Sequence, residues 1–171
     1  MNVKAVCIKL VTGETLFAEL IADDEDPTLT ESNLIKVYRP YSVMLTYNQN
    51  EKYTQFAMNP WVVFSNDLFY YIPASNVVSI SGLDNSHSKL YGSAMLSAEV
   101  KEIRSTIVVD AKTGIIPSKK FENTLDKIVH TFLKYSVRYG LIVPSVEELK
   151  TSLNEFVMTV YNVPDNEMVK Q

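Results

Sequence analysis

The sequence predicts an α+β fold, with a five-stranded, strongly bent antiparallel barrel followed by a C-terminal helical extension of two or three helices. Residues 1–83 hold short stretches of alternating apolar and polar residues, and their spacing leaves no βαβ units. Residues 84–171 instead carry apolar residues at helical spacing. Ten tyrosines and seven phenylalanines against five glycines also favour strands. We therefore predict two domains, 1–83 and 84–171.

The first strands are expected in "AVCIKLVTGETLFAELI", where alternation runs on both sides of a turn at Gly13. In this reading Val6, Ile8 and Leu10 share one face of the first strand. The acidic stretch "ADDEDPTLTES" that follows predicts an exposed loop, because its charges repel one another and its proline blocks regular pairing.

The later strands are expected in three stretches. "NLIKVYRPYSVMLTYN" predicts a strand with a bend at Arg39-Pro40, and "NQNEK" predicts a polar hairpin tip. "YTQFAMNPWVVFS" predicts a strand interrupted at Asn59-Pro60. "LFYYIPASNVVSISGL" predicts two short strands on either side of residues 73–76.

The second half predicts helices. "DNSHSKLYGS" is expected to be a polar linker, and "SAMLSAEVKEIRSTIVV" a helix. "SKKFENTLDKIVHTFLKYSVRYG" predicts a helix that ends at Gly140, and Ser145 with Glu148 forms a capping box for the last helix. The short link "LIVP" between these two suggests a helical hairpin. The expected apolar stripes are Phe121, Leu125, Ile128, Val129, Phe132 and Leu133, then Val146, Leu149, Leu153, Phe156, Val157 and Val160.

The charge distribution argues against a general nucleic-acid binder. The net charge is −4, and residues 1–83 hold five lysines and arginines against nine acidic residues, whereas residues 84–171 hold eleven of each. Neither half is therefore a basic body. No apolar run approaches the roughly 18 residues that span a bilayer, and the N-terminus lacks signal-peptide features. We expect a mature protein in the cytoplasm with no membrane partner.

The sequence shows no pattern typical of a metal, cofactor or catalytic site. A single cysteine, Cys7, and two separated histidines, His87 and His130, exclude a zinc site of the usual spacing. There is no glycine-rich phosphate loop and no Gly-x-Ser-x-Gly motif. The acidic run 23–26 is best read as solvated, and Cys7 as a small buried hydrophobic residue. We expect no metal, no cofactor and no enzyme.

Three motifs in order resemble the Sm-like (LSm) family over about residues 3–83. "IKLVTGETLFAELIADD" resembles its first motif, "SNLIKV" the segment after its third loop, and "YYIPASNVVSI" its second motif. "NPWVVFS" is similar to segments of Sm-like proteins attributed to tailed phages of marine bacteria. The resemblance implies a five-stranded bent sheet that assembles into a ring of six or seven copies and binds uridine- or adenine-rich RNA at the pore.

The resemblance also implies candidate RNA-binding residues. Asn33 matches an asparagine that contacts a base, and Asn76 falls in the second-motif turn. Glu31 stands where the family usually stacks an aromatic ring or histidine, Ser32 replaces a methionine, and Pro73-Ala74 replaces an Arg-Gly pair. A pocket without that ring loses about 1–3 kcal/mol of stacking per base.

Aromatic side chains offer other stacking surfaces, although a core or subunit-interface role is the commoner one for such residues. The candidates are Tyr38, Tyr41, Tyr47, Tyr53, Phe56 and Trp61. Tyr38 is retained with Asn33 and Asn76 as an RNA-binding candidate.

Two functions follow from these expectations. The first is a non-catalytic, phage-encoded Sm-like protein that forms a homo-oligomeric ring and binds RNA. The alternative is a structural or adaptor protein, such as a virion component, that uses the same barrel and binds a host or phage protein through its C-terminal helices. A sheet this small leaves unpaired edges, and pairing between copies would satisfy them.

Overall fold

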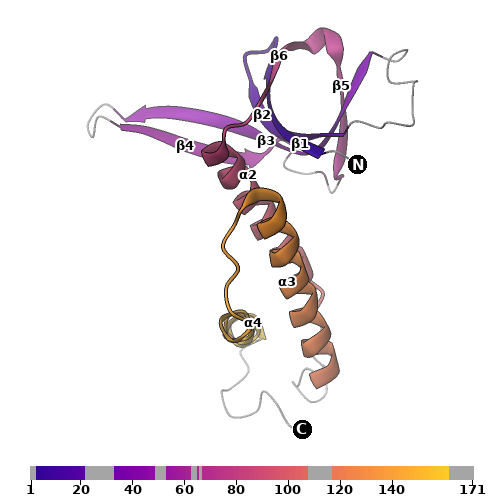
Figure 1. Cartoon of the computed structure of the whole chain (residues 1–171), viewed down its shortest axis with the longest axis vertical. Helices are drawn as coiled ribbons and strands as arrows, with labels where there is room; N and C mark the ends of the chain where they lie inside the picture. The colour runs from indigo at the N-terminus through magenta and orange to yellow at the C-terminus, as the bar shows by residue number, and fades with distance from the viewer. Residues whose placement is uncertain are drawn as a thin grey trace. The chain divides into compact units, whose positions relative to one another are not determined.

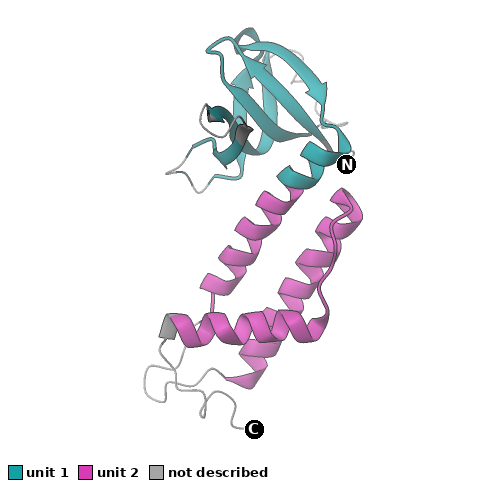
Figure 2. Ribbon diagram, turned by 90° about the vertical axis from the view of Figure 1, so that its left-hand side faces the viewer, with its two compact units in different colours: residues 1–91 teal, residues 92–171 magenta. Residues whose placement is uncertain are grey.

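The computed structural model describes residues 3–21, 33–48, 53–62, 65, 67–107 and 117–161 (Figure 1). The chain divides into two compact units, residues 1–91 and 92–171 (Figure 2). The helix that begins at Asn85 contributes residues to both units, so the predicted domain boundary after residue 83 stays a prediction. The expected loops at 22–32, at the 49–52 hairpin tip and over most of 110–118 lie outside the described residues.

Unit 1 is a strongly curved antiparallel sheet (Figure 1). The pairing order is β4-β3-β2-β1-β6, and β5 also pairs with β3. The predicted α+β class with a bent antiparallel sheet is therefore confirmed. No pairing between β5 and β6 closes the sheet within the described part of the chain, so closure into a barrel stays a prediction. The strands are β1 (Val3–Leu10), β2 (Thr15–Ile21), β3 (Leu34–Asn48), β4 (Tyr53–Pro60), β5 (Phe69–Pro73) and β6 (Val77–Gly82).

The sheet has six strands in the described part of the chain, and the long strand β3 pairs with both β4 and β5 along different parts of its length. β4 pairs with the second half of β3, from Tyr41 onward, and β5 pairs with its first half, up to Tyr38. β3 changes partner at the predicted bend, where Arg39 adopts a left-handed φ of 42°. The Tyr91 hydroxyl donates to the carbonyls of Tyr38 and Arg39, at 3.1 and 3.0 Å, and so ties the first turns of the next helix to this bend.

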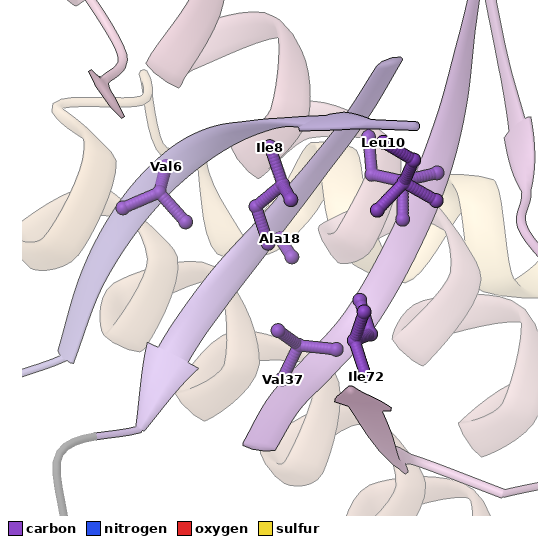
Figure 3. Close-up of a cluster of buried hydrophobic side chains, with 7 residues drawn as sticks. Val6, Ile8, Leu10, Ala18, Val37 and Ile72 are labelled. Carbon is purple, nitrogen blue, oxygen red and sulfur yellow. The ribbon is translucent and has the colours of Figure 1, made fainter. Parts of the chain in front are cut away.

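The core of unit 1 lies on the concave side of the curved strands (Figure 3). Its members come from β1, β2, β3 and β5, and the predicted inner face of β1 is confirmed. The turn between β1 and β2 falls at Gly13, as expected, with a φ of 91° that favours glycine. The buried cluster is Val6, Ile8, Leu10, Leu16, Ala18, Val37 and Ile72.

The expected polar linker is in fact helical. Helix α2 runs over Asn85–Ser105, because Asp84 caps it by accepting a hydrogen bond from the His87 amide at 2.9 Å. Gly92 lies inside this helix instead of breaking it. A Cβ placed on Gly92 would come within 2.5 Å of Cγ of Tyr139, so glycine allows a close helix contact here.

Unit 2 continues with α3 (Ser118–Tyr139) and α4 (Val146–Tyr161). The predicted end at Gly140 is confirmed by its φ of 64°, and the predicted capping box by hydrogen bonds between Ser145 and Glu148. α2 and α3 are antiparallel neighbours, whereas α4 lies across them (Figure 2) and is not the antiparallel arm of a hairpin.

The helix stripes are confirmed in part. Leu125 and Ile128 are buried in α3, whereas Leu133 is half exposed because α3 turns Tyr135 and Tyr139 inward instead. In α4, Leu149, Leu153 and Val157 are buried, but Val146 is exposed at the first turn. No helix in the described part of the chain is both long and apolar enough to cross a membrane.

Candidate functional site

Three connections meet at one end of the curved sheet. The Ala74 amide donates to the carbonyl of Asn33 at 2.7 Å, and the Val11 amide donates to the carbonyl of Asn76 at 3.0 Å. These bonds join the start of β3, the β1–β2 turn and the one-turn 3-10 helix η1 (Ala74–Asn76) between β5 and β6. We call this group, Val11, Asn33 and Ala74–Asn76, the asparagine end.

Asn33 and Asn76 are both exposed at the asparagine end. Asn33 has a φ of 50°, a left-handed conformation that asparagine tolerates better than most residues. Each side-chain amide carries one acceptor and two donors, which is the chemistry needed to contact the edge of a nucleobase. The fold therefore brings together two of the three residues selected from the sequence.

Tyr38 lies elsewhere. It stands five residues along β3 from Asn33, a separation of about 16 Å at the usual rise of a strand. Its ring packs against Phe69 of β5, directly opposite in the register, with ring centroids 5.2 Å apart. Tyr38 and Phe69 therefore form a separate aromatic surface on the face of the sheet away from the core.

Two cations border this aromatic surface. The Lys36 ammonium lies 5.2 Å from the centre of the Phe69 ring, and the Arg39 guanidinium lies 5.7 Å from that of Tyr38. Sequence reasoning missed Phe69 and Lys36. Strand alternation alone could have put Lys36 on the same side as Tyr38, but the register that sets Phe69 opposite Tyr38 was not readable from the sequence.

The other aromatic candidates mostly serve packing. Tyr41 is buried against Tyr91, Phe56 packs on Phe17, and Trp61 packs on Tyr70 beside the core. Tyr47 is exposed on the second half of β3, and nothing is described for the Tyr53 side chain.

The asparagine end is electrically neutral as far as the structure describes it. The residues that replace the Arg-Gly pair are both exposed, with Pro73 ending β5 and Ala74 starting η1. Glu31 and Ser32 lie outside the described residues. The Lys9 ammonium donates to the carbonyl of Gly13 at 2.6 Å and to Thr15, so it is occupied with its own turn.

Three strands, β4, β5 and β6, each pair with a single neighbour in the described part of the chain and so leave one edge open. β6 pairs only with β1, and β5 only with β3, among the residues described. Apolar side chains are exposed on both β5 and β6: Val78 and Ile80 on β6 are 65% and 40% exposed, and Phe69 and Tyr71 on β5 are 45% and 56% exposed. Such edges can accept another strand.

The titratable groups form no metal site within the described ranges, where no three His, Cys, Asp or Glu side chains cluster. The acidic run 23–26 lies outside those ranges. Cys7 is half-buried, and burial raises the pKa of its thiol, against the opposing effects of Lys9 and of a hydrogen bond with Ser81. The carboxylate of Asp84 accepts bonds from His87, and these lower its pKa.

Comparison with models of protein families gives a match over half of the chain. The family model described as an Sm_like domain matches residues 7–92, which span the sheet from β1 through β6 and the first turns of α2. No curated protein matches the chain.

Proposed function

Since the chain belongs to the Sm-like family, we propose that it is a non-catalytic protein that assembles into a homo-oligomeric ring and binds RNA. The observation that carries the RNA-binding part is the hydrogen bond between the Asn33 carbonyl and the Ala74 amide. It holds Asn33 beside η1, which ends at Asn76, so that both asparagine side chains are available to the same ligand.

Assembly is supported by the open edges of β5 and β6. Each copy has one edge of each kind, so pairing β5 of one copy with β6 of the next can continue around a closed ring. The exposed Val78 and Ile80 would be covered in that contact, and so would the apolar side chains of β5.

Light scattering tests the assembly directly. The expected species has a mass several times 19.4 kDa, and Val78→Lys, which puts a charge on the β6 edge, shifts it toward the monomer. The matched control is Val137→Lys, at a position on α3 that is 89% exposed and leaves the mass unchanged. A wild-type mass of 19 kDa at micromolar concentration rules out the ring.

RNA binding is expected to depend on base contacts more than on phosphate contacts, because the asparagine end carries no described charge. The test measures fluorescence anisotropy of labelled 12-nucleotide poly-U and poly-A at low salt and at increasing salt. We expect binding with a shallow salt dependence, since few counterions are released.

The site residue is tested with Asn33→Gly, because glycine keeps the left-handed backbone while removing the amide. One hydrogen bond to a base is worth about 0.5–1.5 kcal/mol, so we expect affinity to fall roughly twofold to tenfold. A matched change outside the site, Ser97→Gly at an exposed position of helix α2, leaves affinity unchanged. Equal affinity of the Asn33 variant and the wild type removes Asn33 from the site.

The similarity of "NPWVVFS" to segments of phage Sm-like proteins supports a phage-encoded protein, acting in the cytoplasm of its host. The lack of a catalytic motif in the sequence supports a binding role without chemistry. Tyr38 enters the proposal as a second stacking surface together with Phe69.

A second candidate function, an adaptor that binds a host or phage protein, is favoured by apolar side chains exposed on the helical unit. Leu133 and Val137 lie one turn apart on α3 and are 49% and 89% exposed, and Ile142 follows at 91%. Exposed apolar side chains on adjacent turns of one helix, such as Leu133 and Val137, are of the kind that protein-binding surfaces use. Two results together would select this function. The chain would bind neither poly-U nor poly-A at low salt, and the Val137→Lys variant would no longer retain a protein that co-purifies with the wild type.

A further inference from the structure

The helical unit contains a groove that none of the preceding functions uses. It has a volume of about 440 Å³, within the range of sites that hold small molecules. One face of α2 forms a wall, and α3 and α4 each add a phenylalanine. The lining residues are Ser93, Leu96, Ser97, Val100, Lys101, Arg104, Phe132 and Phe156.

The chemistry of the groove is divided along α2. Leu96 and Val100 are buried and, with Phe132 and Phe156, make most of the lining apolar. Lys101 and Arg104 supply two positive charges about one turn apart, at the C-terminal end of the helix. An apolar cavity with a few convergent polar groups is the usual form of a small-molecule site.

The two cations are not neutralised within the groove. Neither forms an ion pair with a carboxylate in the part of the chain that the structure describes. Glu99, on the same helix, is engaged by Lys134 at 3.3 Å and by the Tyr135 hydroxyl at 2.8 Å, so it is directed to α3. The charge at this end of the groove is therefore available to a ligand.

Arg104 is already held in position. Its Nη2 donates to Ser152 Oγ at 2.8 Å, and its guanidinium lies 5.6 Å from the centre of the Phe156 ring. Its Nε is buried and has no acceptor among the described residues, so the donors of this guanidinium are not all satisfied. A buried donor without a partner is costly, and an anion at the guanidinium would offset part of that cost.

We propose that this groove binds a small organic anion, with its carboxylate or phosphate on Lys101 and Arg104 and its apolar body against Phe132 and Phe156. A longer RNA fits less well, because two cations supply few of the phosphate contacts on which such binding depends. The inference does not rest on the ring or on RNA binding by the sheet, so each can fail without the other.

The test uses two anionic probes and one neutral probe of similar shape. Saturation-transfer difference NMR, which tolerates a large assembly, measures the affinity of the full chain for 3-phenylpropionate, phenyl phosphate and 3-phenylpropan-1-ol. We expect millimolar binding of at least one anion, as befits about ten non-hydrogen atoms, and binding of the alcohol at least fivefold weaker. The stronger of the two anions tells which headgroup the site prefers.

Substitutions at single residues test whether the anion binds in this groove. Lys101→Gln changes an exposed residue and should weaken the anion threefold to tenfold without altering the circular dichroism spectrum. Arg104→Lys keeps the charge but loses the planar guanidinium, and should also weaken binding. The control Lys150→Gln removes an exposed lysine outside the groove and should change nothing.

Three results would overturn the proposal. One is no signal from either anion at 20 mM, and another is equal affinity for the alcohol, which would leave only apolar contact. The third is a loss of binding in Lys150→Gln with none in Lys101→Gln, which would put the anion elsewhere.

Discussion

Replacing Gly92 by alanine should destabilise the helical unit, although alanine is the better helix former. Gly92 lies inside α2, where alanine alone would gain about 1 kcal/mol. The added Cβ, however, would meet three atoms of Tyr139: Cγ at 2.5 Å and both Cβ and Cδ2 at 2.8 Å. Carbon atoms prefer about 3.5–4.0 Å, so the overlap is close to 1 Å.

A rotation of the tyrosine ring cannot relieve this overlap. One of the clashing atoms is Cβ of Tyr139, which moves only with the backbone of α3, and the ring itself is stacked on Tyr135 with centroids 5.8 Å apart. Overpacking of this kind costs about 1–3 kcal/mol. Because one clashing atom is fixed to the backbone, we take the upper part of this range, about 2–3 kcal/mol. After the gain of about 1 kcal/mol in helix propensity, we expect a net loss of about 1–2 kcal/mol.

Thermal unfolding followed by circular dichroism at 222 nm measures the effect at a fixed protein concentration. For a chain of this length the expected loss lowers Tm by about 2–8 °C. Ser97→Ala, an exposed change in the same helix, should leave Tm unchanged or raise it slightly.

The sign of the change decides whether the argument holds. In a Tyr139→Gly background all three clashing atoms are gone, so Gly92→Ala should become stabilising. A rise in Tm in the wild-type background, or the same shift in both backgrounds, would show that contact with Tyr139 does not govern this position.

Two substitutions and one measurement of thiol reactivity test other parts of the structure. Tyr91→Phe removes the hydroxyl that donates to two carbonyls at the bend of β3, and should cost about 1–3 kcal/mol of stability. The midpoint of urea unfolding, followed by Trp61 fluorescence, should fall, and an unchanged midpoint would contradict the role of this hydroxyl. Hydrogen bonds from the Ser145 amide and hydroxyl lower the pKa of Glu148 in the folded state. The carboxylate therefore contributes stability above its unfolded-state pKa, and this contribution is lost as the pH falls through its folded-state pKa. The Tm of Glu148→Gln should fall less between pH 5 and 3 than the Tm of the wild type, and an equal fall in both would refute this. Burial raises the pKa of Cys7, so the native thiol should react with Ellman's reagent more slowly at pH 7.5 than in urea, and an equal rate would argue against it.

The sheet was predictable where local pattern and packing agree. Alternation in β1 identified Val6, Ile8 and Leu10 as the inner face, and the glycine turn followed from the same stretch. The bend at Arg39 was also predictable, because the proline after it restricts the backbone. The pairing of Tyr38 with Phe69 depends on a register set by distant residues, which no single-strand pattern contains.

The helical half was less predictable for a similar reason. Ser145 and Glu148 form a local motif and were recognised, but Gly92 looked like a linker residue until its contact with Tyr139 was known. The groove combines Arg104 of α2 with Phe156 of α4, and only the crossing of α4 over the other helices unites them. The sequence contained both residues but no sign of their proximity.

The short length of β5 limits how firmly two copies can be joined through it. A neighbour that adds to β5 meets only five residues, a seam of about 17 Å, and the last of them, Pro73, has no amide hydrogen to give. A single interface of this length dissociates readily on dilution, whereas in a closed ring each copy is held by two such interfaces. Such a protein would therefore exist mainly as separate copies or as complete circles, with few open chains between them.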